Sequence, residues 1–175
     1  MLGEQTSTKK LLTNSMKFMA GEVSKHVEVL KHLEAKKYDN LLPSEADMQY
    51  LYICAMRKEG LNHPDNKYLL GLVEKRPALF TIYGKAMMSV ILARNGNVKL
   101  AKEHLESLKQ YTVYTDEMGR YFDTKRASYS WFDYRIPTEV AAIEAIKMVT
   151  PEDKKTVSEM QRWLLQSKRT QSWDT

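Results

Sequence analysis

Residues 77–109 read PALFTIYGKAMMSVILARNGNVKLAKEHLESLK, and this stretch decides the fold class. Pro77 opens a segment that is apolar on nearly every side as far as Arg94, which is typical of a helix at the centre of a bundle. Asn95-Gly96-Asn97 joins a residue suited to the left-handed conformation to a helix cap, the pattern of a tight helical hairpin. The next segment repeats apolar residues at helical spacing: Val98, Ala101, Leu105 and Leu108. The stretch therefore predicts two antiparallel helices.

Apolar residues at spacings of three or four, together with capping signals, predict five further helices. The first runs from about Thr6 to Tyr38. Ser44 and Asp47 form a capping-box-like start for the second, which is expected to end near Gly60. The remaining starts are Asn62-His63-Pro64, Pro137-Thr138-Glu139, and Thr150-Pro151, with Thr150 as the predicted cap. We therefore expect an all-α array of antiparallel helix hairpins.

Residues 110–136 break the helical pattern. They are too many for a plain helical connection, and segments 111–114 and 119–122 have the pattern of short strands on either side of Asp116-Glu117. We expect a small β-hairpin or an irregular, packed excursion here. Six aromatic residues of this stretch form a candidate interaction surface: Tyr121, Phe122, Tyr129, Trp131, Phe132 and Tyr134.

This aromatic stretch has two interpretations. Nearby cations such as Arg120 and Arg126 would suit a surface on which single-stranded nucleic acid stacks. Acidic residues such as Asp116 and Asp123 balance the cations one for one, so aromatic packing over the end of a helical bundle is the simpler interpretation. We therefore expect no nucleic-acid partner.

Composition limits the remaining classes of protein. The 175 residues are 43% hydrophobic, which is enough for one sizeable core, and we expect a single helical domain over residues 1–175. Only 7 Gly and 5 Pro exclude collagen-like and Gly/Pro-rich disordered chains. A net charge of +5 without a block of cations favours a solvated surface. No apolar run is long enough for a membrane span.

The sequence offers few residues for chemistry. Glu22 and His26 are four residues apart on one predicted helix and could pair or hold a metal, but two ligands do not make a site. Cys54 lies in the middle of the second helix, where a buried structural thiol is expected. No Gly-rich phosphate loop and no Gly-x-Ser-x-Gly elbow is present. We therefore predict no catalytic, cofactor-binding or metal-binding residues, and no enzyme.

Three segments carry a resemblance to a known family. They are residues 119–124 (GRYFDT) with Ser130-Trp131, residues 136–145 (IPTEVAAIEA), and residues 162–165 (RWLL) followed by 169–175 (RTQSWDT). Together they resemble bacterial alpha-2-macroglobulin-like proteins. In that family a helix rich in Glu and Ala follows a Trp-containing loop, and the next helix ends in Trp-Leu-Leu before a turn with Trp and Thr. The resemblance is clearest over residues 117–175 and fainter over 43–110.

The resemblance implies an α/α toroid, of which this chain is an incomplete part. The cap-type residues Asp174-Thr175 likewise predict a further helix beyond them. The parent would be a large secreted or periplasmic, often lipid-anchored, protein that traps proteases after a bait region is cut. Expected partners are proteases or other domains of the same large protein.

One feature departs from this family's pattern. The reactive motif of the family is Cys, then Gly or Leu, then Glu-Gln, whose thiol and glutamine form a thioester. Here Leu2 stands where the cysteine would precede Gly3-Glu4-Gln5, and Cys54 is followed by Ala55-Met56. No thioester can therefore form within these residues, and steric trapping or a structural role is expected instead.

Two rival functions remain open. One is a tetratricopeptide-like scaffold that binds a peptide or protein partner, since the hairpin around Asn95-Gly96-Asn97 resembles that repeat, although it occurs only once. The other is an enzyme on the same toroid scaffold, such as a terpenoid cyclase or prenyltransferase, whose acidic cluster and zinc ligands have no match here.

Overall fold

The computed structural model describes residues 2–75, 80–123 and 135–170, with backbone alone at 2–6 and 169–170. Seven helices and one two-stranded sheet occur in these ranges, so the all-α prediction is confirmed. Their bounds are α1 Leu2–Ala35, α2 Glu45–Arg57, α3 Pro64–Lys75, α4 Ile82–Arg94, α5 Val98–Lys109, β1 Thr112–Thr115, β2 Gly119–Phe122, α6 Arg135–Val149 and α7 Lys154–Thr170. The chain divides into two compact units, residues 1–76 and 77–175, where the sequence predicted one domain.

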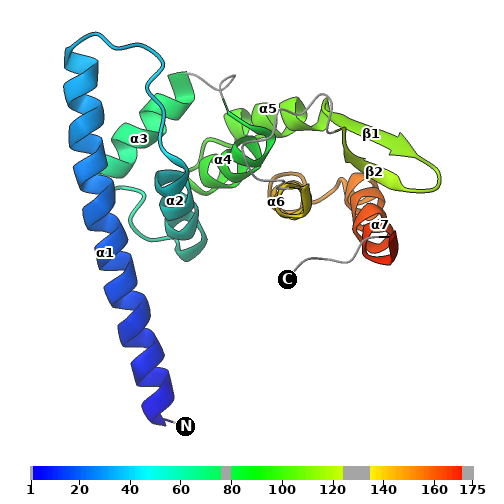
Figure 1. Cartoon of the computed structure of the whole chain (residues 1–175), viewed down its shortest axis with the longest axis horizontal. Coiled ribbons are helices and arrows are strands. Elements are labelled where there is room, and N and C mark those ends of the chain that lie inside the picture. The colour runs from blue at the N-terminus through cyan, green and yellow to red at the C-terminus, as the bar shows by residue number, and fades with distance from the viewer. Residues whose placement is uncertain (1, 76–79, 124–134, 171–175) are drawn as a thin grey trace. The chain divides into compact units, whose positions relative to one another are not determined.

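The first unit consists of the long helix α1 with α2 and α3 packed against it (Figure 1). The C-terminal half of α1 buries one apolar stripe: Val23, Val27 and Leu30. Polar contacts tie the three helices together, because His26 Nδ1 lies 2.5 Å from Asp47 Oδ2 and the Ser24 hydroxyl donates to Asp65 at 2.6 Å. The unit is therefore held by a narrow apolar seam and by side-chain hydrogen bonds.

The start of α2 follows the sequence prediction, and its end does not. The Ser44 side chain accepts the Asp47 amide, and the Asp47 carboxylate accepts the Ser44 amide at 2.7 Å, which completes a capping box. The helix ends at Arg57 rather than near Gly60. Lys58 takes the left-handed conformation with φ 57°, and its amide donates to the carbonyl of Ala55, which closes the last turn early.

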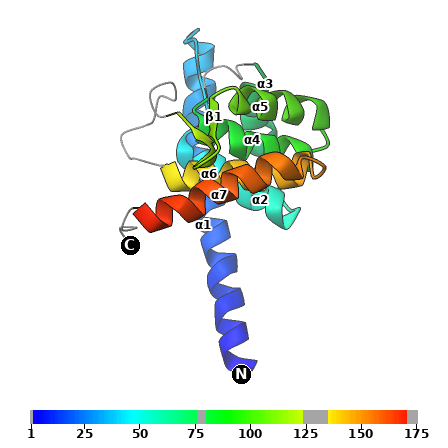
Figure 2. The same ribbon diagram turned by 90° about the vertical axis from the view of Figure 1, so that its right-hand side faces the viewer.

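The second unit is built around α4, as its apolar sequence predicted. Nearly every side chain from Ile82 to Leu92 is buried, and α5 and α6 pack against different sides of this helix. Helix α6 is also largely buried, and it contacts α4, α5 and α7. Figure 2 shows α7 lying across α6. The unit therefore has two central helices, α4 and α6, each followed in the chain by an amphipathic outer helix, α5 or α7.

Two predicted helix starts in this unit were wrong. Pro77 was expected to open α4, but the helix begins at Ile82, because the Thr81 hydroxyl accepts the Gly84 amide at 3.1 Å and makes Thr81 the cap. Thr150 was expected to cap α7, but its hydroxyl donates to the Ile146 carbonyl of the preceding helix at 3.3 Å.

The cap of α7 is instead an acidic residue. Asp153 is this cap, because its carboxylate accepts a hydrogen bond from the Thr156 amide at 3.2 Å. The helix begins at Lys154. In the sixth helix the start lies at Arg135, two positions before the predicted Pro137. The tight hairpin between α4 and α5 is confirmed, with Gly96 at φ 89°. No helix in the described parts of the chain is both long enough and apolar enough to cross a bilayer.

Candidate interaction surface

The predicted β-hairpin is present and lies against α7. Its strands pair antiparallel, with Thr112 opposite Phe122 and Thr115 opposite Gly119. Gly119 has φ 82°, and a Cβ at this position would collide with the backbone carbonyl oxygen of Glu159. Only glycine allows this backbone conformation together with this close approach of the β2 backbone to the α7 backbone. The hairpin therefore packs directly against α7.

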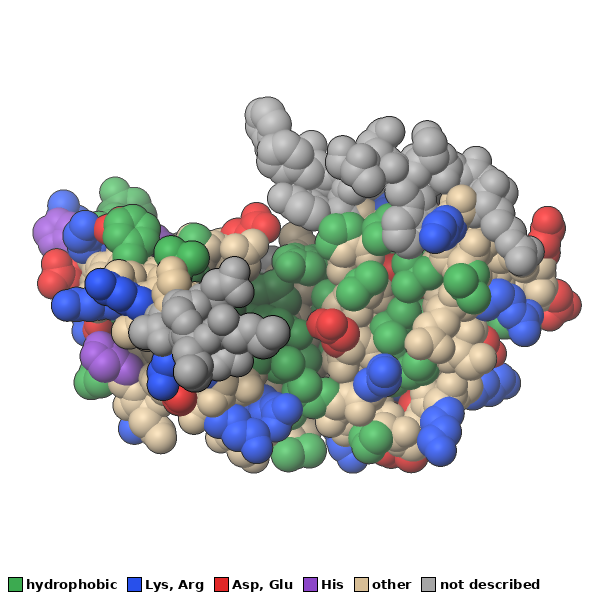
Figure 3. Space-filling model, turned by 90° about the horizontal axis from the view of Figure 1, so that it is seen from below, with side chains coloured by type: hydrophobic (Ala, Val, Ile, Leu, Met, Phe, Trp, Pro, Cys, Tyr) green, Lys and Arg blue, Asp and Glu red, His purple; other side chains and the backbone are tan. Residues whose placement is uncertain are grey.

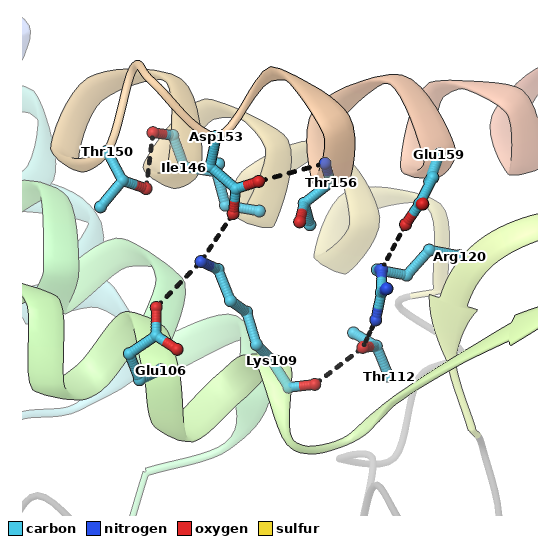
Figure 4. Close-up of polar contacts among 9 residues, drawn as sticks. All are labelled: Glu106, Lys109, Thr112, Arg120, Ile146, Thr150, Asp153, Thr156 and Glu159. Carbon is cyan, nitrogen blue, oxygen red and sulfur yellow. Dashed lines mark hydrogen bonds and ion pairs between the residues drawn. The ribbon is translucent and has the colours of Figure 1, made fainter.

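Charged side chains fasten the hairpin to α7 (Figure 4). Arg120 Nε donates to Glu159 at 2.8 Å, and the same guanidinium donates to the Thr112 hydroxyl at 3.0 Å. At the turn, Arg162 of α7 donates to the backbone carbonyl of Asp116 at 3.2 Å. Because the Arg120–Glu159 pair is largely shielded from solvent, it positions the strand more firmly than an exposed ion pair would.

A second ion pair joins α5 to the start of α7. Lys109 Nζ lies 2.8 Å from Asp153 and 2.9 Å from Glu106 (Figure 4). Burial lowers the pKa of Lys109, but the two carboxylates more than offset this effect, so its pKa lies above the ordinary value. Burial alone would raise the pKa of Asp153. The hydrogen bonds from Lys109 and Thr156 outweigh this effect, so the pKa of Asp153 lies below its ordinary value. Both groups stay charged at neutral pH.

The structure separates the predicted aromatic residues. Tyr121 is half-buried and stacks on Trp163 of α7, with ring centroids 6.0 Å apart and an interplanar angle of 19°. Phe122, its neighbour on β2, is buried in the core. The other four predicted members, Tyr129, Trp131, Phe132 and Tyr134, lie outside the described residues. That the six form one interaction surface remains a prediction.

Hydrophobic side chains do reach the surface of the second unit. Figure 3 shows such side chains between charged ones on one face of the molecule. In this unit Val140 of α6 and Leu165 of α7 are exposed, as is Tyr114 of β1. With Val98 of α5, the exposed apolar residues are scattered over four elements, which is normal for a protein surface and does not by itself mark a binding site.

A buried carboxyl group in α6 was not anticipated from the sequence. Glu139 is 1% exposed, and its Oε1 has no hydrogen-bond partner among the described residues. Burial raises its pKa to about 8, and a backbone hydrogen bond from Phe122 opposes that shift only in part. The neighbouring Thr138 hydroxyl is buried and also lacks a partner there. A neutral carboxylic acid is therefore the favoured form of Glu139 in the folded protein at pH 7.

The structure places the other candidate groups, and one further buried histidine, as follows. His26 contacts Asp47, and Glu22 pairs with Lys25 at 2.7 Å, so the suggested Glu22–His26 pair does not form. Cys54 is buried as predicted, and burial raises the pKa of its thiol. Burial and the nearby charge of Lys85 lower the pKa of His104.

Nothing in the described ranges assembles a metal-binding group. No three His, Cys, Asp or Glu side chains come together there in a way that could hold an ion. The contacts that the sequence did not reveal, Trp163 on Tyr121 and Glu159 on Gly119, join residues that are distant in the chain.

Comparisons with protein-family models, with curated proteins and with solved structures find no match to this chain.

Proposed function

We propose that the chain is a non-catalytic helical domain of an alpha-2-macroglobulin-like protein that traps proteases, and that it is part of an α/α toroid. The observation that supports this most is the layering of the second unit. Two central helices, α4 and α6, pack side by side, and each continues into an amphipathic outer helix. Alternation of central and outer helices along the chain is what an α/α ring requires.

The seating of the β-hairpin favours this proposal over a plain helical solenoid. In a tetratricopeptide-like array each helix pair would stack uniformly, and residues 110–136 would be an insertion without a packing role. Instead Gly119 and Arg120 bind the hairpin to α7, and Phe122 enters the core. The hairpin is thus an integral part of the unit rather than an insertion without a packing role.

The proposed mechanism is steric rather than covalent. The sequence has no Cys followed two positions later by Glu-Gln, and Cys54 is a buried thiol whose pKa is raised by burial. Under the proposal this chain supplies bulk and shape to a secreted or periplasmic protein. Its partners would be proteases or other domains of that protein, and the predicted aromatic residues other than the buried Phe122 would supply part of the contact.

The proposal is tested with the full-length polypeptide encoded by the reading frame that carries these residues. It is mixed with proteases of several classes, and turnover of a small chromogenic peptide is compared with turnover of a large protein substrate. Steric trapping predicts that cleavage of the large substrate is lost while cleavage of the small peptide persists. Equal loss of both, or loss of neither, contradicts it. A Cys54→Ala variant is the matched control and should trap as well as the parent.

A tetratricopeptide-like peptide-binding scaffold is the second candidate. It is favoured by the α4–α5 hairpin, whose tight turn at Gly96 has the geometry of such a pair. An immobilised random peptide array probed with residues 1–175 separates the two functions. Sequence-selective capture of short peptides would support the scaffold, and its absence together with size-selective trapping would support the first proposal.

A further inference from the structure

The two halves of α1 have different surroundings. Val23, Val27 and Leu30 in the C-terminal half are buried. In the N-terminal half, Leu11 and Phe18 are 68% and 69% exposed, and Leu12 is exposed as well. Exposure of a phenylalanine to this extent, together with two leucines in one segment, is more than the scattered apolar residues of an ordinary surface.

The exposed apolar residues of α1 cover a broad face. At about 100° per residue, the large apolar side chains of residues 7–21 fall within one arc about 160° wide, here called the apolar arc, and the rest of the circumference is the polar arc. The apolar arc contains Phe18, Leu11, Met19, Leu12 and Met16, with the small polar residues Ser15 and Thr8 between them. Leu11 and Phe18 lie about 100° or more away from the line that Val23, Val27 and Leu30 continue. Packing of the kind found in the C-terminal half would therefore leave them uncovered.

The polar arc of the same segment carries only positive charge. Lys9, Lys10 and Lys17 lie on it, and residues 7–21 include no Asp or Glu. Acidic residues return at Glu22 and continue into the C-terminal half, where the chain mixes both signs. The exposed half of α1 is thus a basic amphipathic helix, whose complement is an anionic surface.

We propose that residues 7–21 of α1 lie on an anionic lipid surface as an interfacial helix, with Leu11 and Phe18 in the acyl boundary and the three lysines at the headgroups. A wide apolar face bordered by lysines suits a bilayer surface, whereas a helix-binding groove takes a narrower stripe. A second copy of the chain would bring like charges together. The helix would lie in the interface plane without crossing the bilayer.

The proposal is tested by flotation of the purified chain with phosphatidylcholine vesicles that do or do not contain about 30 mol% phosphatidylserine. We expect binding to the anionic vesicles alone. Binding should weaken between about 0.1 and about 0.5 M NaCl, because the Debye length falls from about 10 Å to about 4 Å. Leu11→Ala with Phe18→Ala should lower the partition coefficient about tenfold, and each lysine-to-glutamine change about fivefold.

A matched control comes from the same helix. Val29 is an exposed apolar residue of α1 outside the basic segment, and Val29→Ala should leave vesicle binding unchanged. Circular dichroism checks that each variant keeps its helical content, so a loss of binding is not confused with unfolding.

Four outcomes would overturn the proposal. They are no binding to anionic vesicles, equal binding to neutral ones, binding that survives the Leu11 and Phe18 changes, and equal binding to soluble polyglutamate in competition with vesicles. If sedimentation velocity shows self-association that the same two changes abolish, a second copy covers the face instead. Protease trapping can fail without affecting any of these readouts.

Discussion

The two compact units use helices of different character, and each therefore holds its core in a different way. In the second unit α4 is apolar all round and buries residues on every side, so it needs neighbours on more than one side. In the first unit α1 buries a single apolar stripe over half its length. In that same half, polar contacts to Asp47 and Asp65 add to its attachment. The breadth of a helix's apolar face therefore determines how many neighbouring helices it must have.

The largest expected effect concerns the buried acid of the second unit. The native pKa of Glu139 is about 8 against an ordinary 4.5, so the folded state binds this proton more tightly than the unfolded state. Its contribution to stability is complete below about pH 4.5 and is lost as the pH rises to about 8, by on the order of 5 kcal/mol. Glu139→Gln should remove this loss, so the variant should be more stable than the parent at pH 9 and similar to it at pH 4.5.

Urea unfolding followed by tryptophan fluorescence measures this effect. All three tryptophans lie after residue 77, so the signal reports the second unit. Glu144→Gln changes an exposed acid of the same helix and is the control for the loss of one carboxylate from α6. A parent protein whose stability relative to Glu139→Gln does not change with pH would disprove the assignment.

The next effect tests the packing around α4. Leu92 is fully buried, and Leu92→Ala should lower the free energy of unfolding by about 3 kcal/mol, because it removes apolar contacts and leaves a cavity. Leu165→Ala at an exposed position of α7 should change it by less than about 0.5 kcal/mol. Fluorescence-detected urea titration again gives both values. Equal costs for the two leucines would mean that α4 is not the centre of the unit.

The polar attachment of the first unit is tested at Asp47. This buried carboxylate accepts the Ser44 amide and contacts His26, so Asp47→Ala leaves buried polar groups without a partner. We expect a loss of about 2–3 kcal/mol. Hydrogen exchange measured by mass spectrometry should show faster exchange in peptides of residues 2–75. Faster exchange confined to the second unit would contradict the distinction drawn between the two units.

The smallest effect concerns the attachment of the hairpin. Arg120→Gln removes a largely shielded ion pair with Glu159 and should cost about 1 kcal/mol. Lys155→Gln removes a more exposed contact to the same glutamate and should cost less. If the two substitutions are equivalent in urea titrations, the geometry of the Arg120 pair contributes nothing beyond its charge.

Local signals predicted the structure well wherever the partner groups lie within a few residues. The capping box at Ser44, the hairpin turn at Gly96 and the strands around Asp116 were all found as predicted. The starts of α4 and α7 were wrong, because each region offers more than one capping residue. The side chains of Thr81 and Asp153 accept hydrogen bonds from the first-turn amides of α4 and α7. The Thr150 hydroxyl instead donates to the preceding helix.

The candidate interaction surface was harder to predict from the sequence than the helices were. Aromatic composition identified residues 121–134, but it could not show that Phe122 is buried while Tyr121 stacks on Trp163. The buried state of Glu139 was also missed, since an acid among small apolar residues on a helix is ordinarily solvated. Only the elements that cover it, including the β2 residue Phe122, remove that solvent.

Local sequence patterns are enough to predict that the chain is helical, where most of its helices lie, and that a short hairpin interrupts them. These features depend on periodicity and on hydrogen bonds between near neighbours, which are written into adjacent residues. Tertiary structure alone decided that Gly119 meets Glu159, that Lys109 meets Asp153 and that Glu139 loses its water. Such contacts depend on which segments distant in the chain come together, and the free energy of burial, rather than local propensity, determines that.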